Sequence, residues 1–236
     1  KNYIYKSIFE AFIHAGAVNN CKVNVMPIHS QELESNVDLH SIFANIDGIL
    51  VAPGFGDRGI EGKINCIQYA RENKIPFFGI CLGMQCAVVE FARNKLGFKE
   101  AHSTEIDTNT KYPVIDLMED QKEINNKGGT MRLGSYPCTL TPGTKVADIY
   151  KIKDIAERHR HRFEFNNKYL DDYKDGGMIP AGVNLKDNLV EIIELQGHPW
   201  FIGVQFHPEY HSTVARPHPL FTGFIKACME YNDSRG

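Results

Sequence analysis

The chain has few cysteines and no surplus of charge of either sign. Its six cysteines in 236 residues include no Cys-x-x-Cys pair, which argues against a zinc ribbon and against a framework of disulfides. Free thiols are typical of a reducing compartment, so we expect a cytoplasmic protein. With 26 Lys and Arg against 29 Asp and Glu, the net charge is −3. That charge excludes a general electrostatic attraction to nucleic acid or to an anionic membrane.

Long apolar runs are also absent. No stretch approaches the ~20 residues that span a bilayer, and residues 1–5 lack the apolar centre of a signal peptide. Glycine and proline, with 20 and 11 residues, stay near ordinary usage, which excludes collagen-like and low-complexity chains. The hydrophobic residues make up 42% of the chain. They are enough to form the core of one domain that spans residues 1–236.

Helical and strand patterns alternate along the chain. Residues 7–14 place apolar side chains on one face of a helix, whereas residues 75–80 are almost wholly apolar, as in a central strand of a parallel sheet. The same reasoning predicts strands at residues 22–26 and 46–52 and helices at residues 64–73, 83–94 and 220–229. These units predict an α/β fold with a mostly parallel central sheet and flanking helices, in a flavodoxin-like three-layer arrangement.

The middle and the start of the chain depart from this pattern. Polar residues, turns and short strands dominate residues 97–187, which we interpret as an elaboration of the same domain. Residues 190–195 and 200–206 form a predicted hairpin, an antiparallel extension of the sheet. A sheet of this kind normally opens with a buried strand, but this chain begins at the approach to a helix. Either that strand lies upstream, or Lys1 is not the natural first residue.

The strongest catalytic motif surrounds a cysteine. Gly79-Ile-Cys81-Leu-Gly83 lies between the apolar strand and a predicted helix, and has the form of a nucleophile elbow with cysteine in place of serine. The tight turn brings the sulfur near a helix N-terminus, where the helix dipole favours thiolate. It also aims the backbone N–H of Leu82 at a developing oxyanion. The alternative is a small buried cysteine that only packs, the role that we assign to Cys86.

A base for this thiol follows in Val204-Gln-Phe-His207-Pro-Glu209. His207 can take the proton and return it, and Glu209 can orient the imidazole and stabilise its cation, as the third member of a triad does. His-Pro-Glu alone is a weak signal, because exposed charged turns have similar sequences. Together with the elbow, it predicts a Cys81–His207–Glu209 triad.

The loop after residues 46–52 offers a second wall for the oxyanion site. In Pro53-Gly54-Phe55-Gly56, a backbone N–H can approach a substrate carbonyl only where the residue has little bulk, and proline has no N–H to give. Gly54 is therefore the second predicted donor beside Leu82. An ordinary turn is the alternative for this segment.

Histidines and arginines suggest two further kinds of site. His159 and His161 are two residues apart, and His207 and His211 are four apart. Nearby carboxylates and thiols do not complete a ligand set, so we expect no metal. The basic run of residues 157–162 contains no aromatic residue and belongs to a net acidic chain. That composition favours a role in substrate binding or in a domain interface over nucleic-acid binding.

The motifs around the predicted triad resemble those of class I glutamine amidotransferases. Gly79-Ile-Cys-Leu-Gly-Met-Gln85 and Gln205-Phe-His-Pro-Glu209 carry this resemblance. Further runs resemble the CTP synthase family within that class: residues 54–62, 102–105, 128–134, 157–162 and 218–221. The resemblance covers residues 5–231, nearly the whole chain. In that family this domain is the C-terminal half, and the N-terminal synthetase domain that precedes it is absent here.

The resemblance implies the chemistry of the triad. Cys81 attacks the side-chain amide of L-glutamine, releases ammonia and forms a γ-glutamyl thioester that water hydrolyses to glutamate. His207 is the general base and then the general acid, and Glu209 orients it. The N–H groups of Gly54 and Leu82 stabilise the tetrahedral oxyanion.

The resemblance also implies how the substrate is held. Gln85 and Glu105 bind its α-amino end, and Arg162 lies by its α-carboxylate, helped by the backbone of Phe163. A zwitterion needs acceptors on one side and a cation on the other, which agrees with this assignment. The sequence itself does not choose among the three arginines of the basic run, Arg158, Arg160 and Arg162.

Two positions depart from the common pattern of the family. Many members read Pro-Gly-Gly-Phe-Gly where this chain reads Ala52-Pro-Gly-Phe-Gly56, which affects how freely the oxyanion peptide can flip. Phe163 stands where tyrosine is common, so that a hydroxyl contact is lost.

For the longer family members the resemblance implies amination of UTP to CTP. Ammonia passes internally to the synthetase domain, where Mg-ATP activates UTP, and the glutaminase domain needs no cofactor of its own. GTP is the allosteric activator, with Phe55 and Arg162 near its site, and the full-length enzyme forms homotetramers and filaments.

Three other functions are open at this point. They are the amidotransferase of another pathway, a free-standing γ-glutamyl hydrolase and a non-catalytic assembly module. The runs that resemble CTP synthase argue against the first two, and an intact triad argues against the third.

Overall fold

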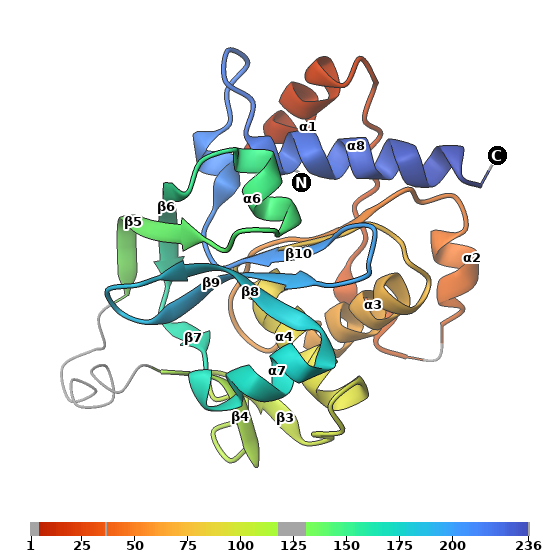
Figure 1. The fold of residues 1–236 in the computed structure, drawn as a ribbon. Helices are drawn as coiled ribbons and strands as arrows, with labels where there is room; N and C mark the ends of the chain where they lie inside the picture. Colours follow the sequence, from red (N-terminus) through yellow and green to blue (C-terminus); the bar gives the residue numbers. More distant parts are fainter. Residues whose placement is uncertain (1–4, 36, 118–130, 236) are drawn as a thin grey trace.

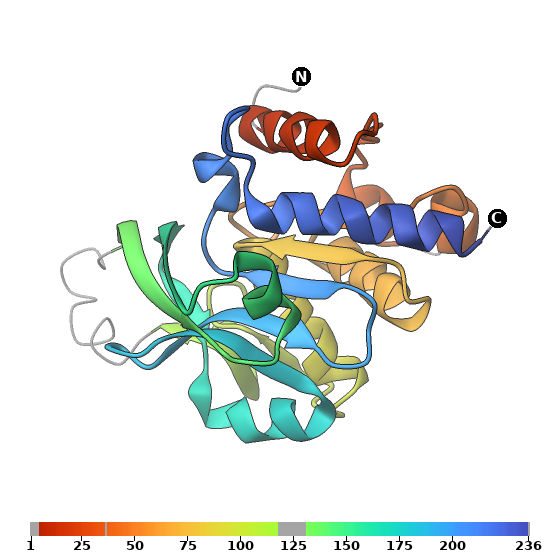
Figure 2. The same cartoon turned by 45° about the horizontal axis from the view of Figure 1, so that its top comes forward.

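The structure, a computed structural model, describes residues 5–35, 37–117 and 131–235. Within them the chain forms a seven-stranded sheet and a three-stranded sheet, with helices on both faces of the larger sheet (Figures 1 and 2). The strands are β1 Ile49–Val51, β2 Phe77–Ile80, β3 Ala101–Ser103, β4 Tyr112–Leu117, β5 Arg132–Leu140, β6 Asp154–His161, β7 Phe163–Phe165, β8 Met178–Asn184, β9 Leu189–Leu195 and β10 Phe201–Val204.

The helices of the same residues connect these strands and cover the sheets. The α-helices are α1 Lys6–Val18, α2 Leu39–Phe43, α3 Ile60–Glu72, α4 Leu82–Asn94, α6 Lys145–Tyr150, α7 Leu170–Gly176 and α8 Pro219–Asp233. Short 3-10 helices are η1 Ser30–Leu33, η3 Asn167–Tyr169 and η4 Pro208–His211. None of the helices described is long and apolar enough to cross a membrane.

The larger sheet is mixed. Its strand order is β1-β2-β10-β9-β8-β5-β6. β1 and β10 each pair parallel with β2, and every ladder from β10 outward to β6 is antiparallel. The α/β class, the flanking helices and the antiparallel extension are confirmed. The expected mostly parallel sheet is wrong, because among the described residues only the β1–β2 and β2–β10 ladders of this sheet are parallel and the other four are antiparallel. The predicted hairpin of residues 190–195 and 200–206 is the β9–β10 pair.

The middle of the chain builds the outer part of this sheet and the smaller one. In the smaller sheet β3 pairs parallel with β4, and β4 pairs antiparallel with β7. Helix α4 contacts both β3 and β4 on one side and β2 and β10 on the other. The small sheet is thus attached to the helix that follows β2.

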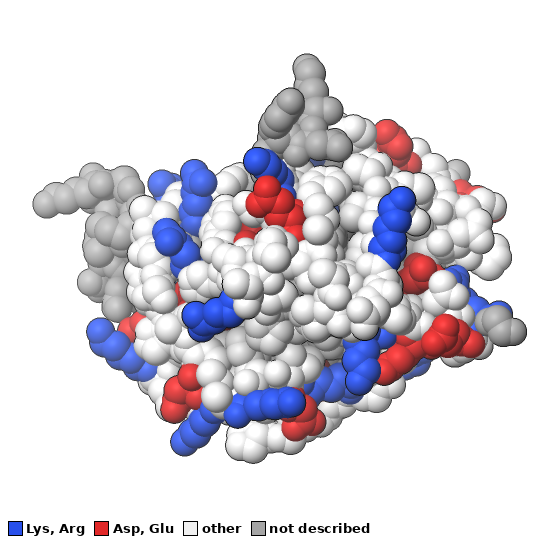
Figure 3. Space-filling view, turned by 90° about the horizontal axis from the view of Figure 1, so that it is seen from above, with Lys and Arg blue, Asp and Glu red and all other residues white. Residues whose placement is uncertain are grey.

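Two hydrophobic clusters lie on opposite faces of the central strands. Helices α3 and α4 enclose one of them, around Phe77 and Met84. Helices α1 and α8 enclose the other, where Phe12 and Phe78 both pack against Phe221. The helices predicted at residues 7–14, 64–73, 83–94 and 220–229 are confirmed as α1, α3, α4 and α8. Charges on the outer surface are interspersed in sign on the face seen in Figure 3.

The strand predicted at residues 22–26 is wrong. The segment lies outside the strands of the structure, and no backbone hydrogen bond among the described residues joins it to the sheet. Its alternation of residue types is real, but a strand also needs a neighbouring strand, and here Lys22 and residues 24–26 are exposed. Strand β1 is also shorter than predicted, because its ladder with β2 covers only three residue pairs.

Candidate active site

Cys81 sits at a sharp turn between β2 and α4. Its backbone has φ 53° and ψ −105°, a conformation that L residues with a side chain rarely adopt. The backbone N–H of Cys81 donates to the Val204 carbonyl at 2.7 Å, which continues the parallel β2–β10 ladder into the turn. A strained cysteine, held by the sheet at the start of a helix, has the geometry expected of a nucleophile elbow.

The glycines on either side allow this turn to form. A Cβ on Gly79 would lie 2.7 Å from the Gly83 carbonyl carbon, and a Cβ on Gly83 would lie 2.2 Å from the Val51 carbonyl oxygen. Both distances are well below van der Waals contact, and the atoms met are backbone atoms that cannot move aside. Glycine is therefore required at both positions for α4 to pack directly on β1 and β2.

The thiol of Cys81 is buried and protonated at rest. Its side chain is 3% exposed. Burial raises the pKa of Cys81 to about 12, and the backbone N–H of Leu82 opposes the rise. Since the hydrogen bond from Leu82 does not overcome this desolvation, the thiol form predominates over the expected thiolate at neutral pH. Nucleophilic attack from this site therefore requires a neighbouring base.

His207 and Glu209 form a buried pair at the end of β10. The Nδ1 atom of His207 lies 2.8 Å from Oε1 of Glu209, and the ring of Tyr210 stacks on the imidazole with centroids 5.1 Å apart. The His207 backbone N–H donates to the Arg158 carbonyl at 2.8 Å. The other ring nitrogen, Nε2, is buried and has no hydrogen-bond partner among the described residues. The imidazole is thus fixed at one nitrogen and free to exchange a proton at the other.

Gln205 contacts Cys81 directly, a placement that the sequence did not single out. Its Nε2 lies 3.8 Å from the Cys81 sulfur. Gln85 donates to Oε1 of Gln205 at 3.3 Å and to the Phe163 carbonyl at 3.1 Å. The signal was present, because Gln205 precedes His207 by two residues, a spacing that places side chains on the same side of an extended segment.

The two predicted oxyanion donors lie side by side. A Cβ on Gly54 would lie 3.3 Å from Cδ2 of Leu82, which brings the loop after β1 against the first residue of α4. Pro53, next to Gly54, supplies no N–H. The structure therefore brings the loop that carries Gly54 against the side chain of Leu82, and the use of their N–H groups stays a prediction.

Two residues of opposite charge interact electrostatically near Cys81. Burial raises the pKa of Glu105, and the charge of Arg162 opposes the rise. The charge of Glu105 in turn raises the pKa of Cys81. Arg158 and Arg160 instead act on Tyr210, whose pKa is raised mainly by burial. Of the three arginines in the basic run, Arg162 is thus the one whose charge lowers the pKa of Glu105.

A buried ion network lies behind this site. Arg132, the first residue of β5, donates to Oε1 of Glu164 and to Oε1 of Glu191, each at 2.9 Å. Its guanidinium also lies 4.3 Å from the centre of the Tyr136 ring. One cation faces two carboxylates, and burial raises the pKa of Glu164 to about 8 and that of Glu191 to about 7. At neutral pH the cluster therefore holds about one proton.

The network is connected to Cys81 through β7. Glu164 follows Phe163, whose carbonyl accepts from Gln85. Arg132 thus fixes the strand that positions Gln85, and through it Gln205. This gives a structural role to Arg132 within the run of residues 128–134, for which the sequence offered none. Residues 128–130 of that run lie outside the described residues.

A second buried carboxylate anchors the turn that follows the triad. Glu157 accepts hydrogen bonds from Tyr150 at 2.8 Å and lies 2.9 Å from His218 Nε2 and 2.8 Å from His211 Nδ1. His211 ends η4, so this cluster holds the segment that carries His207 and Glu209. His218 caps α8 by accepting from the Leu220 backbone N–H at 3.2 Å.

The histidines considered as metal ligands have other partners. Nδ1 of His159 lies 2.8 Å from Nε2 of His161, and burial lowers the pKa of His159 to about 2 and that of His161 to about 3. His211 pairs with Glu157. In the described ranges, no group of three or more His, Cys, Asp and Glu residues is arranged to hold a metal ion.

The remaining predicted residues lie as follows. Phe55 is 61% exposed at the rim of the loop after β1, and Phe163 is half-buried at the start of β7. Cys86 is buried in the cluster between α4 and α3, as predicted for a packing residue.

Comparison with known proteins shows the family to which this chain belongs. Residues 3–227 match the family described as Glutamine amidotransferase class-I. The chain belongs to this family. Within the family, the chain is 61% identical over 228 residues to the CTP synthase of Cytophaga hutchinsonii and 58% identical to that of Christiangramia forsetii. It spans 42% of the length of each of these relatives and 96% and 97% of its own.

A solved structure supports the same classification within class I. The chain superposes on the glutaminase domain of Trypanosoma brucei CTPS, solved with bound acivicin, with a TM-score of 0.92 and 34% identity. The match covers 96% of this chain and 88% of the other. Among class I amidotransferases, this chain is therefore an amidotransferase domain of the CTP synthase type, and the α/β fold expected of the class is confirmed.

Proposed function

We propose that residues 1–236 are the glutaminase domain of a CTP synthase and that Cys81, His207 and Glu209 hydrolyse L-glutamine. The observation that carries this proposal is the elbow: a buried cysteine at φ 53° with Gly79 and Gly83 packed against backbone atoms. The hydrogen-bonded His207–Glu209 pair follows the neighbouring strand β10. These features serve attack on a carbonyl carbon, and a purely structural cysteine needs neither of them.

In the first half-reaction Cys81 Sγ attacks the side-chain amide carbon of glutamine. The thiol proton passes to Nε2 of His207, and Glu209 stabilises the imidazolium through Nδ1. The amide oxygen becomes an oxyanion that the N–H groups of Gly54 and Leu82 stabilise. The C–N bond then breaks, and His207 gives its proton to the leaving nitrogen, which departs as ammonia and leaves a γ-glutamyl thioester.

In the second half-reaction water attacks the thioester carbonyl. His207 takes a proton from the water, and the same two N–H groups stabilise the second oxyanion. The C–S bond breaks, the sulfur recovers its proton from His207, and glutamate leaves. Because the resting thiol has a pKa of about 12, proton transfer to His207 accompanies the attack and does not precede substrate binding.

The α-carbon end of glutamine is bound by charges on opposite sides. Glu105 accepts the α-ammonium group with Gln85 beside it, and Arg162 pairs with the α-carboxylate next to the Phe163 backbone. The electrostatic opposition of Glu105 and Arg162 supports this assignment. A zwitterion placed between them would satisfy both charges.

The rest of the reaction belongs to the longer protein. There ammonia would reach a synthetase domain N-terminal to this one, in which UTP activated by Mg-ATP is aminated to CTP. GTP would act as allosteric activator, and the exposed Phe55 ring and the Arg162 guanidinium are groups that can stack on a base and pair with phosphate. The full-length enzyme is proposed to be a cytoplasmic homotetramer that also forms filaments. The 42% share of its relatives that this chain spans supports such a larger architecture.

The proposal is tested by covalent labelling. A glutamine analogue with an electrophilic carbon is expected to label the full-length protein once per chain, at Cys81. Cys81→Ala should lower glutamine-dependent CTP formation by roughly 10⁴-fold or more while ammonia-dependent formation persists. Cys86→Ala, one helical turn further on, is the matched control and should keep both activities. Label on another cysteine, or glutamine-dependent turnover that survives Cys81→Ala, contradicts the assignment.

A further inference from the structure

Two buried glutamine side chains lie next to Cys81, and the proposed function uses only one of them, Gln85. Gln85 is 4% and Gln205 is 0% exposed. Gln85 belongs to the first turn of α4, and Gln205 directly follows β10. A side-chain amide that is buried away from water needs protein partners for its N–H groups and for its carbonyl oxygen. Those partners decide which end of each amide faces the sulfur.

The Phe163 carbonyl fixes the orientation of both amides. A carbonyl oxygen only accepts hydrogen bonds, so the Gln85 atom 3.1 Å from it is the amide nitrogen. The same nitrogen lies 3.3 Å from the amide of Gln205, whose facing atom must then be the acceptor, Oε1. The nitrogen of Gln205 is therefore the atom that lies 3.8 Å from the Cys81 sulfur. Gln205 presents a hydrogen-bond donor to this sulfur.

Backbone hydrogen bonds hold Gln205 in this position. Its N–H donates to the Glu191 carbonyl at 2.9 Å, and the Glu191 side chain accepts from Arg132. The Cys81 N–H donates at 2.7 Å to the carbonyl of Val204, the residue before Gln205. The backbone of Cys81 is thus bonded to the peptide unit that carries the donor, so the distance between amide and sulfur does not depend on flexible side chains alone.

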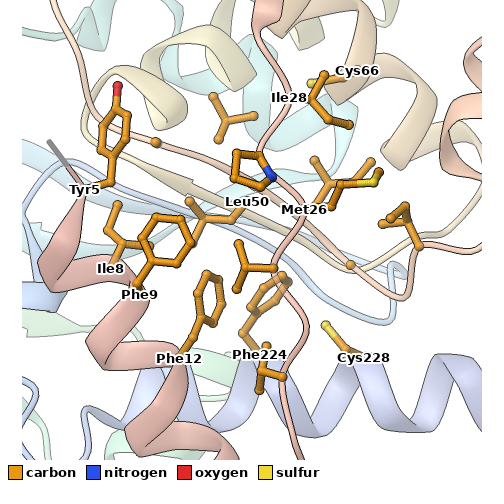
Figure 4. Close-up of a pocket in the computed structure, with 18 of the residues that line it drawn as sticks. Tyr5, Ile8, Phe9, Phe12, Met26, Ile28, Leu50, Cys66, Phe224 and Cys228 are labelled. Atoms are coloured by element: carbon orange, nitrogen blue, oxygen red, sulfur yellow. The ribbon is translucent and has the colours of Figure 1, made fainter. Parts of the chain in front are cut away.

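The cavity beside β1 does not include this contact. It has a volume of about 780 Å³ and lies between α1, residues 21–31, β1 and α8. Figure 4 shows Phe12 and Phe224 among the side chains that surround it. Neither Cys81 nor Gln205 is among the described residues that line it. The N–H···S contact therefore lies in the packed interior, where a hydrogen bond is electrostatically stronger than in water.

We propose that Gln205 is a further catalytic residue, whose side-chain N–H donates a hydrogen bond to the Cys81 sulfur and stabilises negative charge on it. The proposal rests on the proposed function, in which the sulfur gains charge twice. As the S–H bond breaks and its proton passes to His207, the electron pair of that bond forms the S–C bond. As the C–S bond of the thioester adduct breaks, its electron pair returns to the sulfur, which then recovers the proton from His207. A donor fixed beside the sulfur stabilises both transition states.

The other donor near the sulfur has a different task in the reaction. The backbone N–H of Leu82 lowers the pKa of Cys81, so it acts on the sulfur before substrate is bound. In the proposed mechanism the same N–H stabilises the oxyanion of the substrate. Gln205 has no part in the oxyanion site and can donate to the sulfur throughout the reaction.

The same contacts orient Gln85 toward the substrate. Its amide nitrogen donates to the Phe163 carbonyl and to Gln205. The Gln85 oxygen is then the atom that accepts from the α-ammonium group of glutamine. Loss of the Gln205 amide is therefore expected to lower kcat through the sulfur and to raise KM through Gln85.

Alkylation of Cys81 in the full-length protein tests the hydrogen bond. Chloroacetamide reacts with the thiolate and does not need the glutamine site. Gln205→Met removes the donor at similar volume and should slow alkylation of Cys81 at pH 8 by about 3- to 10-fold, as followed by mass spectrometry. Gln196→Met, the same change at an exposed position, is the matched control and should alkylate at the parent rate. A purely structural Gln205 predicts the opposite sign, because looser packing exposes the thiol and speeds the reaction.

Steady-state kinetics of the same proteins test the catalytic role. Gln205→Met should lower kcat for glutamine-dependent CTP formation by about 10- to 100-fold, while ammonia-dependent formation persists. Unchanged kcat together with unchanged or faster alkylation overturns the proposal. A parent protein that the electrophilic glutamine analogue fails to label at Cys81 contradicts the proposed function instead.

A measurement on the unaltered protein covers the case in which Gln205→Met does not fold. In a crystal structure of the full-length protein labelled at Cys81 by the glutamine analogue, Nε2 of Gln205 should stay close to the 3.8 Å from the sulfur found here. A Gln205 amide turned away from the labelled sulfur overturns the proposal.

Discussion

The loop from Ala52 to Phe55 separates two regions that are packed in opposite ways. On one side the elbow allows no spare volume, since a single added carbon on Gly83 would lie 2.2 Å from the Val51 carbonyl oxygen. On the other side the same strand, β1, borders a cavity of about 780 Å³. The difference teaches that the reacting groups are positioned by contacts within this chain. The loop beside them lines the cavity through Pro53 and Gly54.

Arg132→Met gives the strongest test of the closely packed region around Cys81. It removes the cation that contacts Glu164 and Glu191, leaving two buried carboxyl groups without compensation, and should lower the free energy of unfolding by about 3–5 kcal/mol at pH 8. Urea unfolding at pH 8 measures the loss. Arg132→Lys keeps the charge and should lose less, and a variant as stable as the parent would show that the network does not hold β5 to β7 and β9.

Gly83→Ala tests the packing of the elbow itself. The new Cβ must push α4 away from β1, at a cost of roughly 1–3 kcal/mol from overpacking, and it should displace Cys81 and lower labelling. Gly143→Ala is the control, because Gly143 has φ 80° but no atom within 4 Å of the Cβ position; we expect about 1 kcal/mol from backbone strain alone. Thermal melting compares the two variants. Equal losses of Tm would show that the close packing around Gly83 does not require glycine.

The change in stability over a single pH unit should be the smallest of these effects. The pKa values of Glu164 and Glu191 are raised to about 8 and about 7, above the unfolded value, so the folded chain binds more protons. Stability should therefore fall as pH rises from 6.5 to 8.5, by about 1.4 kcal/mol per pH unit for each proton released. Below pH 6.5 the buried neutral histidines His159 and His161 reverse the slope, since the unfolded chain then binds the extra protons.

The free energy of unfolding, measured at pH 6.5, 7.5 and 8.5, tests whether stability falls as the pH rises. Glu191→Gln should reduce the slope between those values, because it removes one of the two groups. A parent chain whose stability rises across this interval would contradict the raised pKa values.

The sequence predicted what depends on near neighbours along the chain. The elbow, the His207–Glu209 pair and four helices follow from local patterns, and the structure places each as expected. The features that the sequence did not predict depend on contacts between residues that are far apart in the chain. Residues 22–26 look like a strand but lack a partner, and Gln205 meets Gln85 across 120 positions of sequence. Residue type alone does not specify such contacts, because they follow from strand order and register.

The protonated state of Cys81 also bears on how the protein survives oxidants. Peroxides and simple alkylating agents react with thiolates, and burial keeps this sulfur as a thiol with a pKa of about 12. In the proposed mechanism Cys81 loses its proton only when a fitting amide is in place, so it would be spared sulfenic-acid formation between turnovers. The burial that raises the thiol pKa would then also make Cys81 selective, because it would react with its substrate and not with oxidants.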